Sequence, residues 1–141
     1  MKSHINIELI ESYRYTNYRV ITDPNAITLL IDHFSEPLSQ LITASNPPCA
    51  ALISAYNPFS QCHSQEENLT AHKRLGQALR HDSNQIIEST NLDPSGRWPP
   101  ERSLLALGLN LDTAKTIGRQ FYQNAIIWIS KDAIPRLILL R

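Results

Sequence analysis

Cysteine is scarce in this sequence, and neither sign of charge is in excess. The 141 residues include two cysteines, Cys49 and Cys62, which are too few for a disulfide framework. Lys plus Arg number 13 and Asp plus Glu number 13, so the formal net charge is zero. A neutral, mixed surface provides no field that would steer nucleic acid or anionic lipid toward the chain. We therefore expect neither nucleic-acid binding nor membrane binding.

Long apolar runs and metal-ligand patterns are also missing. No apolar run approaches the roughly 20 residues that cross a bilayer. The N-terminal segment MKSHINIELIESYRY carries acidic and polar residues where a signal peptide would be apolar, so we expect a cytoplasmic location. The five histidines do not combine with the cysteines at zinc-type spacing. We expect no metal and no cofactor.

Proline and polar turn residues divide the chain into short segments of strand and helix character. The segments with strand character lie near 18–22, 27–31, 50–54, 85–89, 103–107, 125–129 and 136–140. Helical periodicity covers 4–14, with Ser3 as its expected cap, and also 37–45, 64–81 and 111–122. A chain of this length forms one ordinary domain. The alternation predicts a single α+β (or α/β) domain, residues 1–141, whose mixed β-sheet of five to six strands packs with at least three helices.

The stretch AYNPFSQCHSQEEN, residues 55–68, concentrates functional groups between the strand at 50–54 and the helix at 64–81. In open α/β sheets, ligands collect at the carboxyl ends of strands beside helix N-termini. Pro58 fixes its own φ and favours an extended Asn57, which predicts a rigid ledge. The acidic first turn of the helix and the lack of a preceding Gly-rich loop argue against a phosphate site.

Asn68 and Glu67 each allow a structural and a functional interpretation. Asn68 continues the inward stripe of Ala71 and Leu75, so it either ties down the preceding loop or orients a ligand. Ser64 and Glu67 fit a capping box, and the alternative is that Glu67 acts as a base at a pocket mouth. The structural interpretation is the commoner one for buried polar groups.

Cys62 and His63 come directly before this helix. A thiol at a helix N-terminus can act as a nucleophile with a nearby histidine as its base. Adjacent residues rarely point at one reacting atom, and the acidic first turn opposes thiolate formation. We therefore do not predict a catalytic cysteine.

The segment GRWPPE, residues 96–101, forms a second candidate rim. In one interpretation Trp98 stacks on a planar ligand while Arg97 and Glu101 fix its polar edge. In the other, Trp98 packs over the sheet and the prolines stiffen the loop. The last helix ends at Gln123 and Asn124. Asn124 fits a left-handed helix stop, and Gln123 either closes that turn or joins the polar cluster.

The order and spacing of these motifs resemble a known family. The segments AYNP, EEN on the next helix, W..E before an apolar strand, and FYQNAIIW are together similar to the bacterial family known as domain of unknown function 3293. They span residues 55–128, about half of the chain. The resemblance implies no mechanism, because the family has no assigned activity. It places these residues on the family's motif positions: Tyr56, Asn57, Pro58, Glu67, Asn68, Trp98, Glu101, Gln123 and Asn124.

Two hypotheses about function follow. The first is a pocket for a polar small molecule or nucleotide derivative at the junction of strand 50–54 and helix 64–81. Its ligand contacts would be Tyr56, Asn57, Asn68, Trp98, Gln123 and Asn124, and Glu67 or Glu101 would perform any acid–base step. The second is a non-catalytic interaction or regulatory domain whose polar motif residues are structural. In that case the apolar strand at 137–140 would pair with a second copy of the chain or another partner. The sequence does not separate the two hypotheses.

Overall fold

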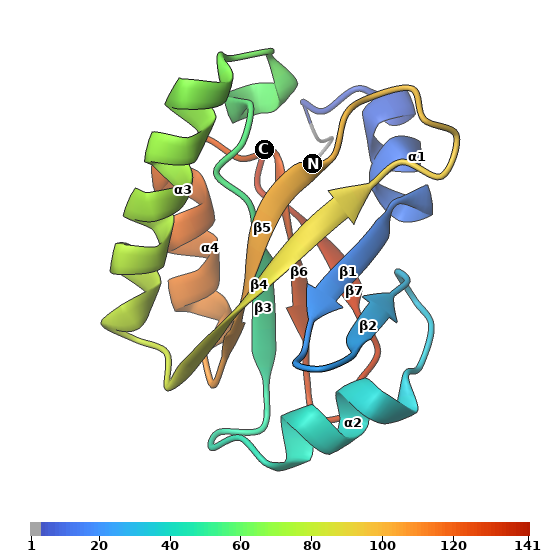
Figure 1. Cartoon of the computed structure of the whole chain (residues 1–141), viewed down its shortest axis with the longest axis vertical. Helices are drawn as coiled ribbons and strands as arrows, with labels where there is room; N and C mark the ends of the chain where they lie inside the picture. The colour runs from blue at the N-terminus through green and yellow to red at the C-terminus, as the bar shows by residue number, and fades with distance from the viewer. Residues whose placement is uncertain (1–3) are drawn as a thin grey trace.

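One curled, antiparallel sheet organises the molecule (Figure 1). The structure is a computed structural model that describes residues 4–141. Within these residues seven strands pair in the order β2–β1–β4–β5–β3–β6–β7. Their bounds are β1 (Asn17–Ile21), β2 (Ala26–Leu29), β3 (Ala50–Ile53), β4 (Gln85–Leu92), β5 (Glu101–Leu107), β6 (Ala125–Ile129) and β7 (Arg136–Leu139).

Side-chain caps define where the helices begin. The helices are α1 (Ile7–Tyr15), α2 (Glu36–Thr43), α3 (Gln65–Arg80) and α4 (Leu111–Gln120), with a short 3-10 turn η1 (Pro58–Ser60). Asn6, Ser35, Ser64 and Asn110 each accept a hydrogen bond from a first-turn backbone N–H. The expected cap of the first helix, Ser3, lies outside the described residues. No helix within residues 4–141 combines the length and the apolar character needed to cross a bilayer.

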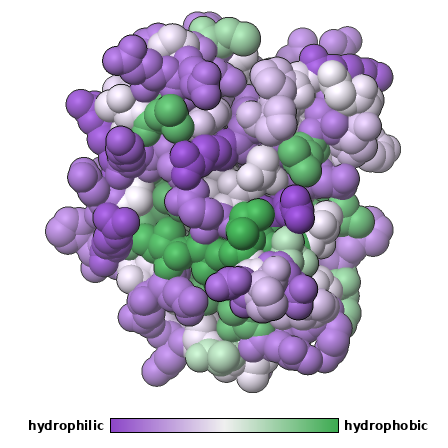
Figure 2. Space-filling model, viewed as in Figure 1, coloured by the Kyte–Doolittle hydropathy of each residue, from purple (hydrophilic) through white to green (hydrophobic). Residues whose placement is uncertain are grey.

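Apolar side chains form one layer on each face of the sheet. On the outer face, α3 contacts β4 and β5 while α4 contacts β3 and β6. On the inner, concave face, Leu38 and Ile42 of α2 join the core with Leu52 and Leu105. Every residue of β3 is buried, which confirms the prediction that the continuously apolar strand is covered on both sides. Figure 2 shows apolar side chains gathered across the middle of the face viewed, between mainly hydrophilic upper and lower parts.

The predicted mixed sheet is wrong, although the α+β class is confirmed. Every neighbouring pair of strands is antiparallel. The helical connections explain the difference, because α3 joins β3 to β4 on either side of β5, and α4 joins β5 to β6 on either side of β3. The linked strands are therefore parallel to each other but always separated by an antiparallel strand.

The predicted count of five to six strands is also wrong. All seven segments with strand character enter the same sheet, including the four-residue edge strands β2 and β7. Beyond the edges, the Asp32 backbone N–H donates to the Pro135 carbonyl over 2.8 Å, which brings the two ends of the curl together near α2. The sheet thus forms a half-barrel that is closed at one end by backbone contact.

Candidate functional site

The concave face of the sheet is filled by core at one end and hollow at the other. Apolar side chains of α2 occupy the first end. At the second end, beside α1, lies a cavity of about 250 Å³ whose apolar floor includes Tyr18, Leu52, Ile127 and Leu137. These floor residues come from strands distant in sequence, and the cavity exists only because the sheet curls around it.

A reciprocal pair of asparagines fixes the loop at the cavity mouth. The Asn57 backbone N–H donates to Asn68 Oδ1 over 2.9 Å, and Asn68 Nδ2 donates to Asn57 Oδ1 over 2.9 Å. Asn57 Oδ1 also accepts from the His63 backbone N–H. Asn68 is 6% exposed, and its position confirms the inward stripe of α3. Its contacts are those of the structural interpretation, because both ends of its amide are used to hold the loop.

The predicted extended ledge at Asn57 is wrong. Asn57 has φ 45° and ψ 67°, which is left-handed rather than extended backbone. The steric bias of a residue before proline is overcome here, since asparagine tolerates this region and hydrogen bonds hold both its amide and its backbone.

Glu67 lies in the predicted capping box and not in the cavity. The Ser64 backbone N–H donates to Glu67 Oε1, and the Glu67 backbone N–H donates to Ser64 Oγ. These contacts with the Ser64 backbone and hydroxyl hold the pKa of Glu67 below its ordinary value. The carboxylate is mostly exposed and does not belong to the cavity lining.

Glu101 is the carboxylate that the fold brings to the cavity wall. It is the first residue of β5, and Asn57 Nδ2 donates to its Oε1 over 2.9 Å. Burial raises the pKa of Glu101, and the hydrogen bond from Asn57 only partly opposes this effect. Among residues 4–141 no lysine or arginine lines the cavity, so no cation there offsets the burial of this carboxylate.

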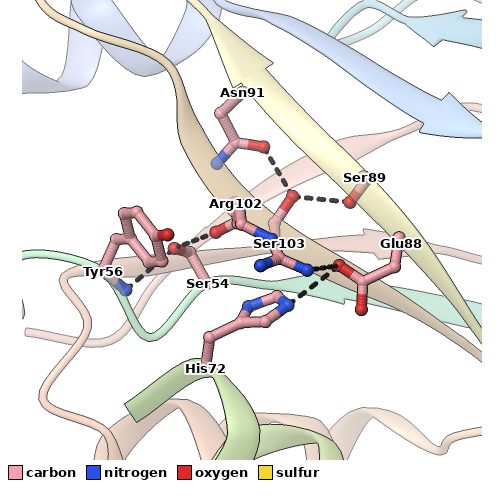
Figure 3. Close-up of polar contacts among 8 residues, drawn as sticks. All are labelled: Ser54, Tyr56, His72, Glu88, Ser89, Asn91, Arg102 and Ser103. Carbon is pink, nitrogen blue, oxygen red and sulfur yellow. Dashed lines mark hydrogen bonds and ion pairs between the residues drawn. The ribbon is translucent and has the colours of Figure 1, made fainter. Parts of the chain in front are cut away.

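A buried chain of hydroxyl and amide groups runs from Ser89 through Ser103 to Asn91 (Figure 3). The Ser103 hydroxyl donates to Asn91 Oδ1 over 2.7 Å, and Ser89 Oγ lies 2.5 Å from Ser103 Oγ. Since a serine hydroxyl has one proton, Ser89 is then the donor to Ser103. Asn91 is 9% exposed, lines the cavity and faces Glu101 across the β4–β5 pair.

Ser89, Ser103 and Asn91 were not among the predicted site residues, and Asn91 lies beyond the predicted strand end at residue 89. In the structure β4 continues to Leu92 and β5 begins at Glu101. The polar run at 88–91, read as a continuation of the strand, places Ser89 and Asn91 on one face and is the signal that would have found them.

Asn124 fastens α1 to the rest of the cavity wall. Asn124 Nδ2 donates to the Tyr13 hydroxyl and to Ser60 Oγ, each over 3.1 Å, and its Oδ1 accepts from Arg141. The predicted left-handed stop at Asn124 is wrong, because the left-handed residue of this turn is Tyr122, with φ 57°. Gln123 both closes the turn and joins the polar cluster, as the two interpretations of this residue predicted. Its Nε2 donates to the Phe121 carbonyl within the turn and to the Tyr56 carbonyl of the loop.

Trp98, Tyr56 and Cys62 complete the predicted residues near the cavity. Trp98 is half-buried and lines it, as one interpretation of the second rim requires. Tyr56 also contributes to the lining, while its ring makes an edge-to-face contact with His72 at 6.1 Å between centroids. Cys62 is an exposed free thiol at the cavity rim.

Strained backbone gathers at the same rim. Asn57, Phe59, Ser60 and Tyr122 all have positive φ, between 45° and 60°. Such conformations each cost free energy in residues other than glycine and cluster at functional sites. The Phe59 backbone N–H donates to the Tyr122 carbonyl over 2.8 Å, so two of the strained residues hold each other.

Comparison with known proteins gives one match. The family described as Protein of unknown function (DUF3293) matches residues 53–126. The chain belongs to this family. No curated protein and no solved structure matches the chain significantly.

The DUF3293 segment contains most of the polar groups of the cavity but not all of its walls. The Asn57–Asn68 pair, Asn91, Glu101 and Asn124 lie within it, and the resemblance predicted from the motifs is confirmed. Outside it lie α1, with Tyr13, and the four floor residues Tyr18, Leu52, Ile127 and Leu137. The polar half of the cavity is thus the part that the DUF3293 family describes.

A second polar cluster of the DUF3293 segment lies on the outer face of the β4–β5 hairpin, opposite the Ser89–Ser103–Asn91 chain (Figure 3). Glu88 Oε1 accepts from Arg102 and contacts His72 Nε2, each over 2.9 Å. Burial alone would raise the pKa of Glu88, but hydrogen bonds from Arg102 and His72 outweigh it and the pKa lies below its ordinary value.

In the described part of the chain, no three His, Cys, Asp or Glu side chains form a metal-binding group.

Proposed function

We propose that this protein binds a small polar molecule in the concave cavity, with Glu101 as the central polar group. The observation that carries the proposal is a carboxylate withdrawn from water at the wall of a cavity that no lysine or arginine of residues 4–141 lines. Burying a charge without a cationic partner costs folding free energy. A ligand that donates hydrogen bonds to Glu101 explains why such a group is placed there.

The shape and stiffness of the cavity support the same proposal. Its volume of about 250 Å³ lies just below the roughly 300–1,000 Å³ of pockets for drug-sized ligands, so it suits a one- or two-ring molecule. The Asn57–Asn68 pair and the strained rim hold the mouth in one conformation. A preformed mouth lowers the entropic cost of binding.

The charge of the lining argues against anionic ligands. A phosphate or carboxylate would meet Glu101 with no cation in the described lining to neutralise it. If the bound molecule is also transformed, Glu101 is the group that would exchange a proton with it, since burial moves its pKa upward toward neutral pH.

The test compares Glu101→Gln with the parent in a thermal-shift screen of neutral and cationic metabolites. We expect at least one compound to raise the melting temperature of the parent and to lose that effect in the variant. Glu67→Gln is the matched control, because it removes a carboxylate outside the cavity and should leave the shift unchanged. If no compound of any charge acts on the parent, the binding proposal is wrong.

A second candidate function is self-association through β7. The observation that favours it is the position of β7 at the edge of the sheet, with Leu137, Ile138 and Leu139 all partly exposed. An edge strand offers unpaired backbone groups to a second copy. Sedimentation of the parent at high concentration tests this proposal, and a monomer throughout would exclude it.

A further inference from the structure

We infer that the molecule bound in the cavity presents an N–H donor beside a ring nitrogen or carbonyl acceptor, as the amidine or lactam edge of a nitrogen heterocycle does. The inference rests on the proposed function and adds the chemical class of the ligand. It is carried by a donor and an acceptor that the fold places side by side on the cavity wall.

Asn91 supplies the donor. Its Oδ1 accepts the Ser103 hydroxyl, whereas its Nδ2 makes no hydrogen bond within the described residues. Figure 3 shows that nitrogen on the side of the amide away from Ser103. Among the described residues, the fully buried side-chain nitrogen without a hydrogen bond is His72 Nδ1, so the unused N–H group of Asn91 is not sealed in the core and opens to the cavity that this residue lines. A ligand acceptor in the cavity would satisfy it.

The amide of Asn91 is held in this orientation by the groups beneath it. Ser89 is 1% exposed and Ser103 is fully buried. Their hydroxyls form a chain in which each proton is used, and the last proton points at Asn91 Oδ1. The chain therefore fixes which end of the amide faces the cavity.

Glu101 supplies the acceptor directly opposite. The antiparallel register pairs Asn91 with Glu101, and directly opposed side chains have Cβ atoms about 4.5–5.5 Å apart. Glu101 Oε1 accepts from Asn57, and its Oε2 has no hydrogen-bond partner among residues 4–141. One donor and one acceptor at this separation match the edge of a heterocycle that carries an acceptor next to an N–H group.

Trp98 adds an aromatic ring to the lining of the cavity. It is half-buried and lines the cavity together with Pro99. An indole ring offers a stacking face for a flat ring, which an aliphatic amine would not use. The class of ligand is therefore a planar heterocycle rather than a simple ammonium ion.

The experiment uses three small probes against the full chain labelled with nitrogen-15. The probe 2-aminopyridine has its amino donor beside the ring acceptor, 4-aminopyridine has the same atoms with the two groups apart, and benzoate is an anion of similar size. Titration is followed by the resonances of the Trp98 indole N–H and the Asn91 side-chain amide. We expect 2-aminopyridine to shift both and to bind about tenfold more tightly than 4-aminopyridine, with no shift from benzoate.

Three variants assign the contacts. Asn91→Leu removes the donor, and Glu101→Gln places a donor where the ligand donor would lie, so each should weaken 2-aminopyridine about tenfold or more. Asn91→Asp turns the donor into an acceptor and should shift the preference toward benzamidine, which presents two donors. Glu67→Gln is the matched control and should bind 2-aminopyridine like the parent.

The outcomes separate the two levels of the proposal. If all aminopyridines bind equally, or binding survives Asn91→Leu, the inferred edge is wrong while the cavity remains a binding site. If neither these probes nor the wider screen shifts the Trp98 resonance, the proposed function is itself wrong.

Discussion

The β4–β5 hairpin carries a polar cluster on each face, and the two clusters differ in how far their members satisfy one another. On the outer face, Glu88 accepts from Arg102 and contacts His72, so two positive or polar partners surround one carboxylate. On the inner face, the chain from Ser89 through Ser103 ends at Asn91, whose amide nitrogen has no partner among the described residues.

Under the proposed function, this difference separates groups that stabilise the fold from groups that would contact a ligand. The outer cluster is half in solvent, with the Glu88 side chain 52% exposed, and this carboxylate contacts both Arg102 and His72. The inner cluster is buried up to Asn91, whose unused N–H group opens to the cavity, where a ligand acceptor would take the place of water. The outer cluster is not wholly satisfied either, because the buried Nδ1 of His72 has no partner in the described structure.

The largest expected effect is a loss of folding stability, and it distinguishes two asparagines with nearly equal burial. Asn68 uses both ends of its amide on Asn57, so Asn68→Ala should lower the free energy of unfolding by about 2–3 kcal/mol. Asn91 leaves its donor unused, so Asn91→Ala should cost less than half as much. Urea denaturation measures both, and equal losses would remove the distinction between the two clusters.

The next effect compares the two carboxylates at neutral pH. Glu88→Gln weakens contacts with Arg102 and His72, and because Glu88 and Arg102 are each about half exposed the loss should be about 0.5–1 kcal/mol. Glu101→Gln removes a buried charge while leaving an oxygen to accept from Asn57, so the variant should be as stable as the parent or more stable. A clear loss in Glu101→Gln would show that Glu101 is structural.

A smaller effect is the pH dependence of these differences. Glu101 has a raised pKa, so its contribution favours the fold below its ordinary pKa and is lost as the pH rises through the folded value. The advantage of Glu101→Gln over the parent should therefore grow from acid to neutral pH. Glu88 has a lowered pKa, so its contribution is lost as the pH falls, and the deficit of Glu88→Gln should shrink in acid. Melting temperatures between about pH 2.5 and pH 7 test both slopes, since the Glu88 change lies below the ordinary pKa of glutamate and the Glu101 change above it.

The smallest effect on stability comes from the two cysteines. Cys62 is exposed at the cavity rim, whereas Cys49 is buried and donates to the Leu109 carbonyl over 3.3 Å. Burial also raises the pKa of the Cys49 thiol, which disfavours its thiolate. Iodoacetamide should modify Cys62 alone, leave the melting temperature nearly unchanged, and weaken 2-aminopyridine binding by crowding the rim. Mass spectrometry locates the adduct, and modification of Cys49 first would contradict the burial.

The sequence predicts those features that depend on neighbouring residues. The capping box of Ser64 and Glu67, the inward position of Asn68 and the buried strand β3 are set by local periodicity, and all three are confirmed. Strand order is different, because each helical connection passes over one antiparallel strand and nothing local records that. The cavity could not be predicted from the sequence either, because its walls come from α1, β4 and β7, which meet only when the sheet curls.

The helix α1 gives the cavity a mechanical property of its own. No residue of α1 is fully buried. The Tyr13 hydroxyl of α1 forms hydrogen bonds with Ser60 Oγ and Asn124 Nδ2, and water can replace both bonds. This wall should therefore open in local unfolding long before the sheet does, and its amides should exchange hydrogen faster than those of α3. A molecule that fills the cavity and touches α1 would bind only the closed form. Binding in the cavity would then slow the hydrogen exchange of the α1 amides, so exchange along this helix would measure how much of the cavity is occupied.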